Sequence, residues 1–142
     1  MKTQLVAAAL GLLLLCGTVA AQEKVPCPSD EALYFFRAEL NQVVDARTVA
    51  LDIDLGFRVW LHKTQIRLSG IEALDKSTPE GQRAMEWLTG KLRDASDLGE
   101  LRIKTFPAPR GSDIPWIGVL FAAGKDLNQE MIAQGLVKAA KP

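Results

Sequence analysis

Residues 66–75 read Ile-Arg-Leu-Ser-Gly-Ile-Glu-Ala-Leu-Asp, and the pattern of the chain changes within this stretch. Branched and apolar side chains lead into it as in a strand, which Gly70 brings to an end. Residues 78–80, Thr-Pro-Glu, then supply a capping hydroxyl, a proline at the first helical position and an acid in the first turn. The sequence therefore predicts a strand over 59–71 and a helix over 79–93.

Further strands are predicted on both sides of this stretch. Residues 34–44 are rich in aromatic and branched side chains, with an irregularity expected at Asn41 and Gln42. Residues 48–57 alternate between apolar and polar side chains, which predicts a half-buried strand with Val49, Leu51, Ile53 and Leu55 on its inward face. Downstream we expect strands over 101–106 and 116–123, then a short helix that residues 125–128 open and Gly135 ends.

The first residues of the chain have the pattern of an export signal. Lys2 precedes an apolar run over 5–19, and Val19-Ala20-Ala21 places small residues where a signal peptidase cuts. We expect a signal peptide over 1–21, a flexible leader over 22–33 and one domain over 34–140. The exported chain would be periplasmic or secreted, without a transmembrane segment after cleavage; an uncleaved anchor is the alternative.

Charge and cysteine content limit the function classes. The whole chain has 17 basic and 17 acidic residues, so it lacks the basic excess that is common in proteins that grip a phosphate backbone. Cys16 lies inside the predicted signal, which leaves Cys27 alone in the mature chain. Cys27 is therefore either an inert free thiol or the site of an intermolecular disulfide.

Four strings resemble the staphylococcal nuclease-like family, in the family's order. Residues 43–49, Val-Val-Asp-Ala-Arg-Thr-Val, resemble its opening Val-Asp-Gly-Asp-Thr-Val turn, and 66–75 resemble its Arg-Leu-x-Gly-Ile-Asp-Ala-Pro-Glu segment. Residues 124–136 are similar to its closing helix, and 52–61 to the wider hairpin of a phage and bacterial branch. The resemblance implies an α+β, mainly β fold, a five-stranded barrel of the oligonucleotide-binding (OB) type with capping helices.

The resemblance also implies calcium-dependent cleavage of DNA and RNA and assigns residues to it. Arg67 falls on a phosphate-binding catalytic arginine, Glu72 on a metal-binding aspartate, and Asp75 on the glutamate that handles the attacking water. Both acids keep the charge but differ in length by one methylene, and Leu74 replaces the proline between them. The plain alternatives are an exposed strand arginine and two solvated loop acids.

Two other positions depart from the family pattern. Arg47 stands where the family has a second metal-binding aspartate, and Pro115 where it has a second phosphate-binding arginine. Arg47 or Arg110 could take the place of that second arginine. Asp45 matches a family acidic position beside the site, although a turn aspartate that bonds its own backbone is the simpler account.

Two functions follow as expectations. The first is an exported binding module, derived from a nuclease and without a cofactor, that holds protein, nucleic acid or another polyanion and has lost or weakened its nuclease activity. The second is a calcium-dependent phosphodiesterase that works with Arg67, Glu72 and Asp75. His62 is interpreted as a surface histidine, and the three tryptophans as core or rim packing rather than base-stacking platforms.

Overall fold

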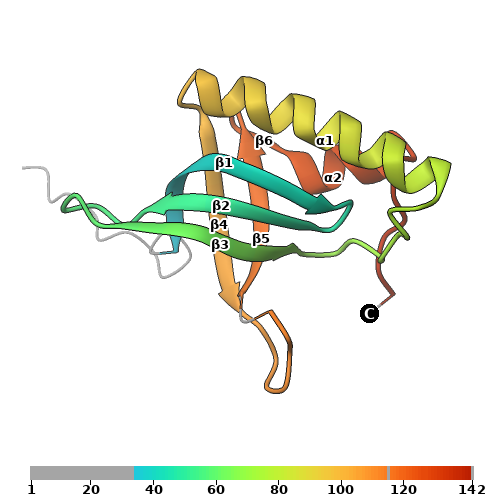
Figure 1. Cartoon of the computed structure of the whole chain (residues 1–142), viewed down its shortest axis with the longest axis horizontal. Helices are drawn as coiled ribbons and strands as arrows, with labels where there is room; N and C mark the ends of the chain where they lie inside the picture. Colours follow the sequence, from blue (N-terminus) through green and yellow to red (C-terminus); the bar gives the residue numbers. More distant parts are fainter. Residues whose placement is uncertain (1–33, 115, 142) are drawn as a thin grey trace, which may run out of the picture.

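The computed structural model describes residues 34–114 and 116–141 (Figure 1). The predicted signal peptide over 1–21, the leader over 22–33 with Cys27, and Pro115 lie outside the described residues. Export, cleavage and a disulfide through Cys27 therefore stay predictions. Neither helix in the described part of the chain is long and apolar enough to cross a membrane.

The predicted fold class is confirmed: the domain is mainly β, with a closed five-stranded barrel and two helices. Most of the predicted elements are found within a few residues of their predicted ends. In chain order the elements are β1 (Phe35–Asp45), β2 (Thr48–Asp54), β3 (Trp60–Leu68), α1 (Pro79–Asp97), β4 (Leu101–Pro107), β5 (Trp116–Ala122), β6 (Lys125–Asp126) and α2 (Leu127–Ala133).

The sheet closes on itself through one short parallel pairing. Its order is β3-β2-β1-β4-β5-β6, with neighbouring strands antiparallel. An additional parallel pairing joins β3 to β5, with Arg67 opposite Ile117 and Leu68 opposite Gly118. We call this pairing the seam. It closes strands β1 to β5 into a barrel, and β6 pairs with β5 outside the barrel.

Local irregularities bend the strands enough to close so small a barrel. The register of β1 against β2 shifts between Leu40 and Gln42, which confirms the predicted irregularity. Lys63 in β3 has a left-handed φ of 51°, close to the register shift between Leu51 and Ile53 in the pairing of β2 with β3. Bulges of this kind increase twist and turn a strand. They let β1 pair with β4 at one end and with β2 along its length.

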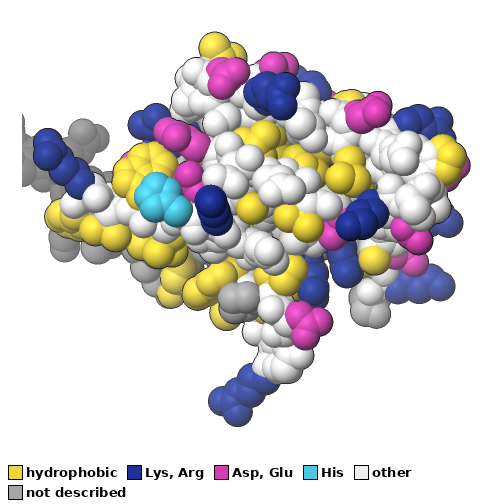
Figure 2. Space-filling model, viewed as in Figure 1, with side chains coloured by type: hydrophobic (Ala, Val, Ile, Leu, Met, Phe, Trp, Pro, Cys, Tyr) yellow, Lys and Arg dark blue, Asp and Glu magenta, His cyan; other side chains and the backbone are white. Residues whose placement is uncertain are grey.

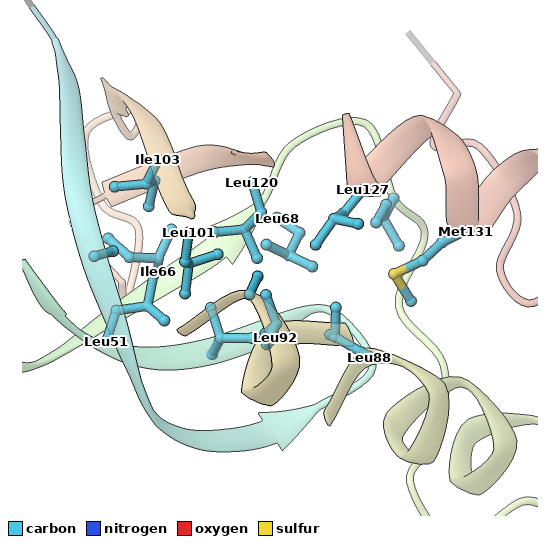
Figure 3. Packing of buried hydrophobic residues seen from close by; sticks show 14 of the residues in the cluster. Leu51, Ile66, Leu68, Leu88, Leu92, Leu101, Ile103, Leu120, Leu127 and Met131 are labelled. Carbon is cyan, nitrogen blue, oxygen red and sulfur yellow. The ribbon is translucent and has the colours of Figure 1, made fainter. Parts of the chain in front are cut away.

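The core lies inside the barrel and beneath α1. Inward side chains of β2, β3, β4 and β5 meet Leu88 and Leu92 of α1, and all of these are fully buried (Figure 3). Helix α1 begins as predicted, because the Thr78 side chain accepts a hydrogen bond from the Gly81 N–H and Pro79 occupies the first turn. It continues four residues beyond Arg93, to Asp97, because Ala95 keeps the buried spacing.

Two sequence predictions need correction. Residues 125–128 were predicted to open α2, but the helix begins at Leu127, and Lys125 and Asp126 pair with β5 as the two-residue strand β6. Asp126 then caps the helix, its carboxylate accepting from the Gln129 N–H at 3.0 Å. Leu55, predicted to face inward, is 39% exposed, because β2 ends at Asp54 and the following hairpin reaches beyond the barrel.

Candidate anion-binding site

Arg67 lies at the seam, where three strands meet. It pairs with Thr48 of β2 on one side and with Ile117 of β5 on the other. Its Nη1 donates a hydrogen bond to the Ser112 hydroxyl at 3.3 Å, which ties it to the loop between β4 and β5. The residue is half-buried, so the prediction of a simply exposed strand arginine does not describe it.

The guanidinium of Arg67 is incompletely satisfied. Its Nε is buried and has no hydrogen-bond partner within the described part of the chain. Nor does any described carboxylate form an ion pair with Arg67. A buried donor without a partner costs about 1–3 kcal/mol, and more when it is charged. An oxyanion at this position would remove that cost, because a guanidinium matches two oxygens of a phosphate or carboxylate in one plane.

The turn between β1 and β2 brings Arg47 to the same end of β3. The carbonyl of Arg47 accepts a hydrogen bond from the N–H of Leu68 at 2.7 Å, next in the chain to Arg67. Asp45 Oδ1 accepts from the Arg47 N–H at 2.7 Å, which confirms the interpretation of Asp45 as a turn aspartate that bonds the backbone. Residues 45, 47 and 67 are thus held in one neighbourhood by backbone bonds.

The β4–β5 loop places Arg110 close in sequence to the Ser112 contact. The Ser112 N–H donates to the Pro109 carbonyl at 3.2 Å, so a tight turn carries Arg110 and Gly111. Arg110 is exposed and makes no ion pair with the acids of residues 34–114 and 116–141. Ser112 is the site residue that the sequence did not reveal, because only its place in this loop connects it with Arg67.

The two predicted acids lie further along the chain, and no hydrogen bond or ion pair between described residues joins them to Arg67. Glu72 is exposed; its N–H donates to the Lys138 carbonyl at 2.9 Å. Asp75 Oδ1 accepts from the Ser77 N–H at 2.8 Å and from the Ser77 hydroxyl at 2.7 Å. The carboxylate of Asp75 is therefore engaged in the turn that leads into α1.

These bonds favour the charged form of the carboxylate and lower the pKa of Asp75 from its ordinary value of 3.8. The backbone N–H of Ser77 has the largest effect and its hydroxyl the next. A general base works best when its pKa lies near the working pH, so the shift makes Asp75 a weaker base.

Replacing Ser77 with alanine should raise the pKa of Asp75 part of the way to 3.8, because the hydroxyl bond is removed and the backbone bond remains. A carboxyl with a depressed pKa stabilises the fold above its unfolded pKa and stops doing so as the pH falls through its folded pKa. The stability difference between Ser77→Ala and the unmodified chain should therefore shrink at low pH. An NMR titration of the Asp75 carboxyl, with Ser112→Ala as control, measures this; an unchanged pKa in Ser77→Ala would contradict it.

Asp45 and Glu72, the predicted metal ligands, do not belong to a ready-made metal centre. Within the described residues no group of three or more His, Cys, Asp or Glu side chains is arranged to hold a metal ion. Calcium takes six to eight oxygen ligands, as a rule with several carboxylates among them. Calcium binding at this site stays a prediction.

The remaining conspicuous side chains are the histidine and the three tryptophans. His62 is on the surface, as predicted, with Nδ1 3.2 Å from Asp52 Oδ2. The Lys63 N–H donates to Asp52, and this bond is the main cause that lowers the pKa of the Asp52 carboxyl. Trp60 and Trp87 are half-buried, whereas Trp116 is 41% exposed at the mouth of the barrel.

No protein-family model and no curated protein matches this chain. Membership of the staphylococcal nuclease-like family is therefore not established. The similarity of the four strings to that family, together with the geometry of Arg67, supports only a functional proposal.

Proposed function

We propose that this chain is an exported binding module, built on a barrel of the staphylococcal nuclease type, that holds the phosphates of a nucleic acid strand without cutting it. The buried Nε of Arg67, with no partner among the described residues, carries the proposal. The Ser112 bond fixes the guanidinium. Because Nε is buried, a phosphate oxygen can accept a hydrogen bond from it only after the neighbouring side chains move aside. Arg47 and Arg110 supply further positive charge from the adjoining turn and loop.

Three features favour binding over cleavage. The Asp75 carboxylate is bonded to Ser77 and has a lowered pKa, so it is poorly suited to activate a water molecule. Arg47 puts a cation where the resemblance calls for a metal-binding acid, and cations repel calcium. No hydrogen bond or ion pair among the described residues joins Arg67 to Glu72 or Asp75, whereas catalysis by a base demands that the base be held close to the reacting group.

The charge of the chain sets the expected strength of binding. Acidic and basic residues are equal in number, so long-range attraction to a polyanion is weak. Affinity would come from a few local contacts and would fall as salt is added. We expect weak binding that is best measured at low ionic strength.

Fluorescence anisotropy of a labelled single-stranded DNA oligonucleotide tests the proposal. Arg67→Ala should weaken binding roughly 10- to 100-fold, the usual value of a charged hydrogen-bonded contact. Arg67→Lys should restore only part of the affinity, because lysine keeps the charge but not the planar fork. The slope of log Kd against log salt should fall by about 0.7 in Arg67→Ala, because the variant neutralises one phosphate of the single strand fewer.

Arg93→Ala is the matched control, because Arg93 is an exposed arginine of α1 and its removal changes the net charge equally. Equal losses of affinity in Arg67→Ala and Arg93→Ala would show that net charge alone causes the effect, which would contradict a binding site at Arg67. Release of acid-soluble nucleotides, in calcium and in EDTA, distinguishes binding from cleavage. Calcium-dependent release that Arg67→Ala abolishes would replace the proposed module with the phosphodiesterase.

A further inference from the structure

The end of the barrel away from α1 is open and apolar. A pocket of about 280 Å³ lies there. Its lining comes from the start of β1 with the preceding Tyr34, from β2, β3 and the hairpin between them, from β4 and from the start of β5. Among the described residues that line it, seven are apolar or aromatic and the other two are Thr64 and Thr105, so none of them is charged. We call this pocket the mouth.

The β2–β3 hairpin displays apolar side chains next to the mouth. Leu55 and Leu61, which line the mouth, are 39% and 42% exposed, and Val59 between them is 50% exposed. Phe57 at the hairpin tip is fully exposed, at 101%. The bonds Leu55 N–H to Val59 O and Val59 N–H to Gly56 O, both 2.9 Å, close the turn that holds Phe57 outward.

Together the mouth and the hairpin form one apolar surface. Yellow side chains follow this end of the molecule in Figure 2. Its large exposed members are Tyr34, Leu55, Phe57, Val59, Leu61 and Trp116. Their exposed fractions correspond to roughly 600 Å² of apolar area, if a fully exposed large side chain presents about 150–250 Å². That lies at the upper limit for the largest patch on a typical monomer and near the ~800 Å² per partner of a stable complex.

We propose that a second copy of this chain covers this surface, with Phe57 of each copy inserted into the mouth of the other. The surface carries both a projecting ring and a hollow, so it is complementary to itself, as a two-fold symmetric interface requires. In such a dimer the β2–β3 hairpins of the two copies lie side by side and point in opposite directions. The tip of each hairpin then reaches the mouth of the other copy, which Leu55 and Leu61 line.

The size and chemistry of the mouth favour this occupant over a small molecule. Its volume of about 280 Å³ is at the lower end of the ~300–1,000 Å³ usual for ligand pockets and suits one aromatic side chain. It offers few polar groups to orient a polar ligand. Between Trp60 and Ile66, β3 also has no strand on its side away from β2 in the described part of the chain, so its edge is open to a second copy.

Sedimentation equilibrium of the chain expressed from its full coding sequence tests the proposal, after its N-terminus is determined by mass spectrometry. Reductant is present throughout, so a Cys27 disulfide cannot produce the dimer. We expect a monomer–dimer equilibrium that high salt does not weaken, because the surface is apolar. Phe57→Asp should raise the dimer Kd about 100-fold or more, because two buried rings are removed from each dimer.

Leu98→Asp is the control, since Leu98 is 72% exposed and lies on the turn after α1, outside this surface. Its dimer Kd should equal that of the unmodified chain, and circular dichroism should show both variants folded. A Trp60→Phe, Trp87→Phe background leaves Trp116 as the only tryptophan to report on the mouth. Its emission should shift to shorter wavelength on dimerisation, and Phe57→Asp should abolish the shift.

Three results would overturn the proposal. The chain could remain monomeric at millimolar concentration, or Phe57→Asp could dimerise as tightly as the unmodified chain. A dimer whose Trp116 emission does not change would place the interface elsewhere. This test does not depend on the Arg67 site. A monomer that binds DNA would overturn the dimer alone, and a dimer that does not bind DNA would overturn the proposed function alone.

Discussion

Asn128→Leu is expected to lower the free energy of unfolding by about 3–5 kcal/mol, since three hydrogen bonds from a buried side chain to the backbone are removed together. The Asn128 side chain is 1% exposed. Its Oδ1 accepts from the Leu120 N–H at 3.2 Å, and its Nδ2 donates to the carbonyls of Ser69 at 2.9 Å and Gly118 at 3.2 Å. This one side chain joins α2 to β5 and to the residue that follows β3.

Leucine has the branched shape and the number of heavy atoms of asparagine and leaves no cavity, so the expected decrease comes mainly from polar groups left without partners. Urea unfolding followed by circular dichroism measures the difference. Gln129→Leu is the control, because Gln129 is the exposed neighbour in the same helix and surface substitutions usually change stability by less than about 0.5 kcal/mol. Equal stability of Asn128→Leu and the unmodified chain would show that these bonds contribute nothing net.

Gly118→Val is expected to cost about 3 kcal/mol or more, because the barrel has no room for a side chain at this point of the seam. A Cβ added to Gly118 would lie 2.8 Å from Ile66 Cγ2 and 3.0 Å from Ile103 Cδ1. Both isoleucines are fully buried, so neither can move into solvent. Overpacking of a tight core costs about 1–3 kcal/mol and occasionally more, and valine adds three carbon atoms here.

Gly90 provides a control with the opposite sign. It lies in α1 with nothing within 4 Å of an added Cβ, so Gly90→Ala should stabilise the chain by about 0.5–1 kcal/mol through helix propensity. Thermal unfolding of both variants gives the comparison. A melting temperature of Gly118→Val equal to that of the unmodified chain would mean that β5 shifts freely, which contradicts a closed, tightly packed barrel.

Local patterns predicted most of the fold. The 3.6-residue spacing of Ala84, Leu88 and Leu92 and the cap at Thr78 located α1, and alternation located β2. Closure of the barrel could not be derived from such patterns, because the seam pairs residues far apart in the sequence. The resemblance to a known family supplied it as an expectation. The strand character of Lys125 and Asp126 was missed because only pairing with β5 makes them a strand.

The candidate site divides in the same way. The bonds of Asp45 to its own turn and of Asp75 to Ser77 span two residues, so local sequence can predict them. The buried Nε of Arg67 and its bond to Ser112 depend on the arrival of the β4–β5 loop. Position in the sequence identifies Arg67 as a candidate, whereas only the packing around it identifies the atom that lacks a partner.

The seam also bears on how fast the chain can fold. Arg67 and Leu68 are separated in the sequence from Ile117 and Gly118 by α1 and β4, so their pairing closes a long loop. Closing this loop lowers the entropy of the chain, and that loss comes before the contacts between β3 and β5 form and offset it. Barrels dominated by such non-local contacts fold on the order of milliseconds to seconds, far more slowly than helical bundles of the same size. Topology, more than stability, therefore sets the time during which the apolar strands are exposed before the barrel closes.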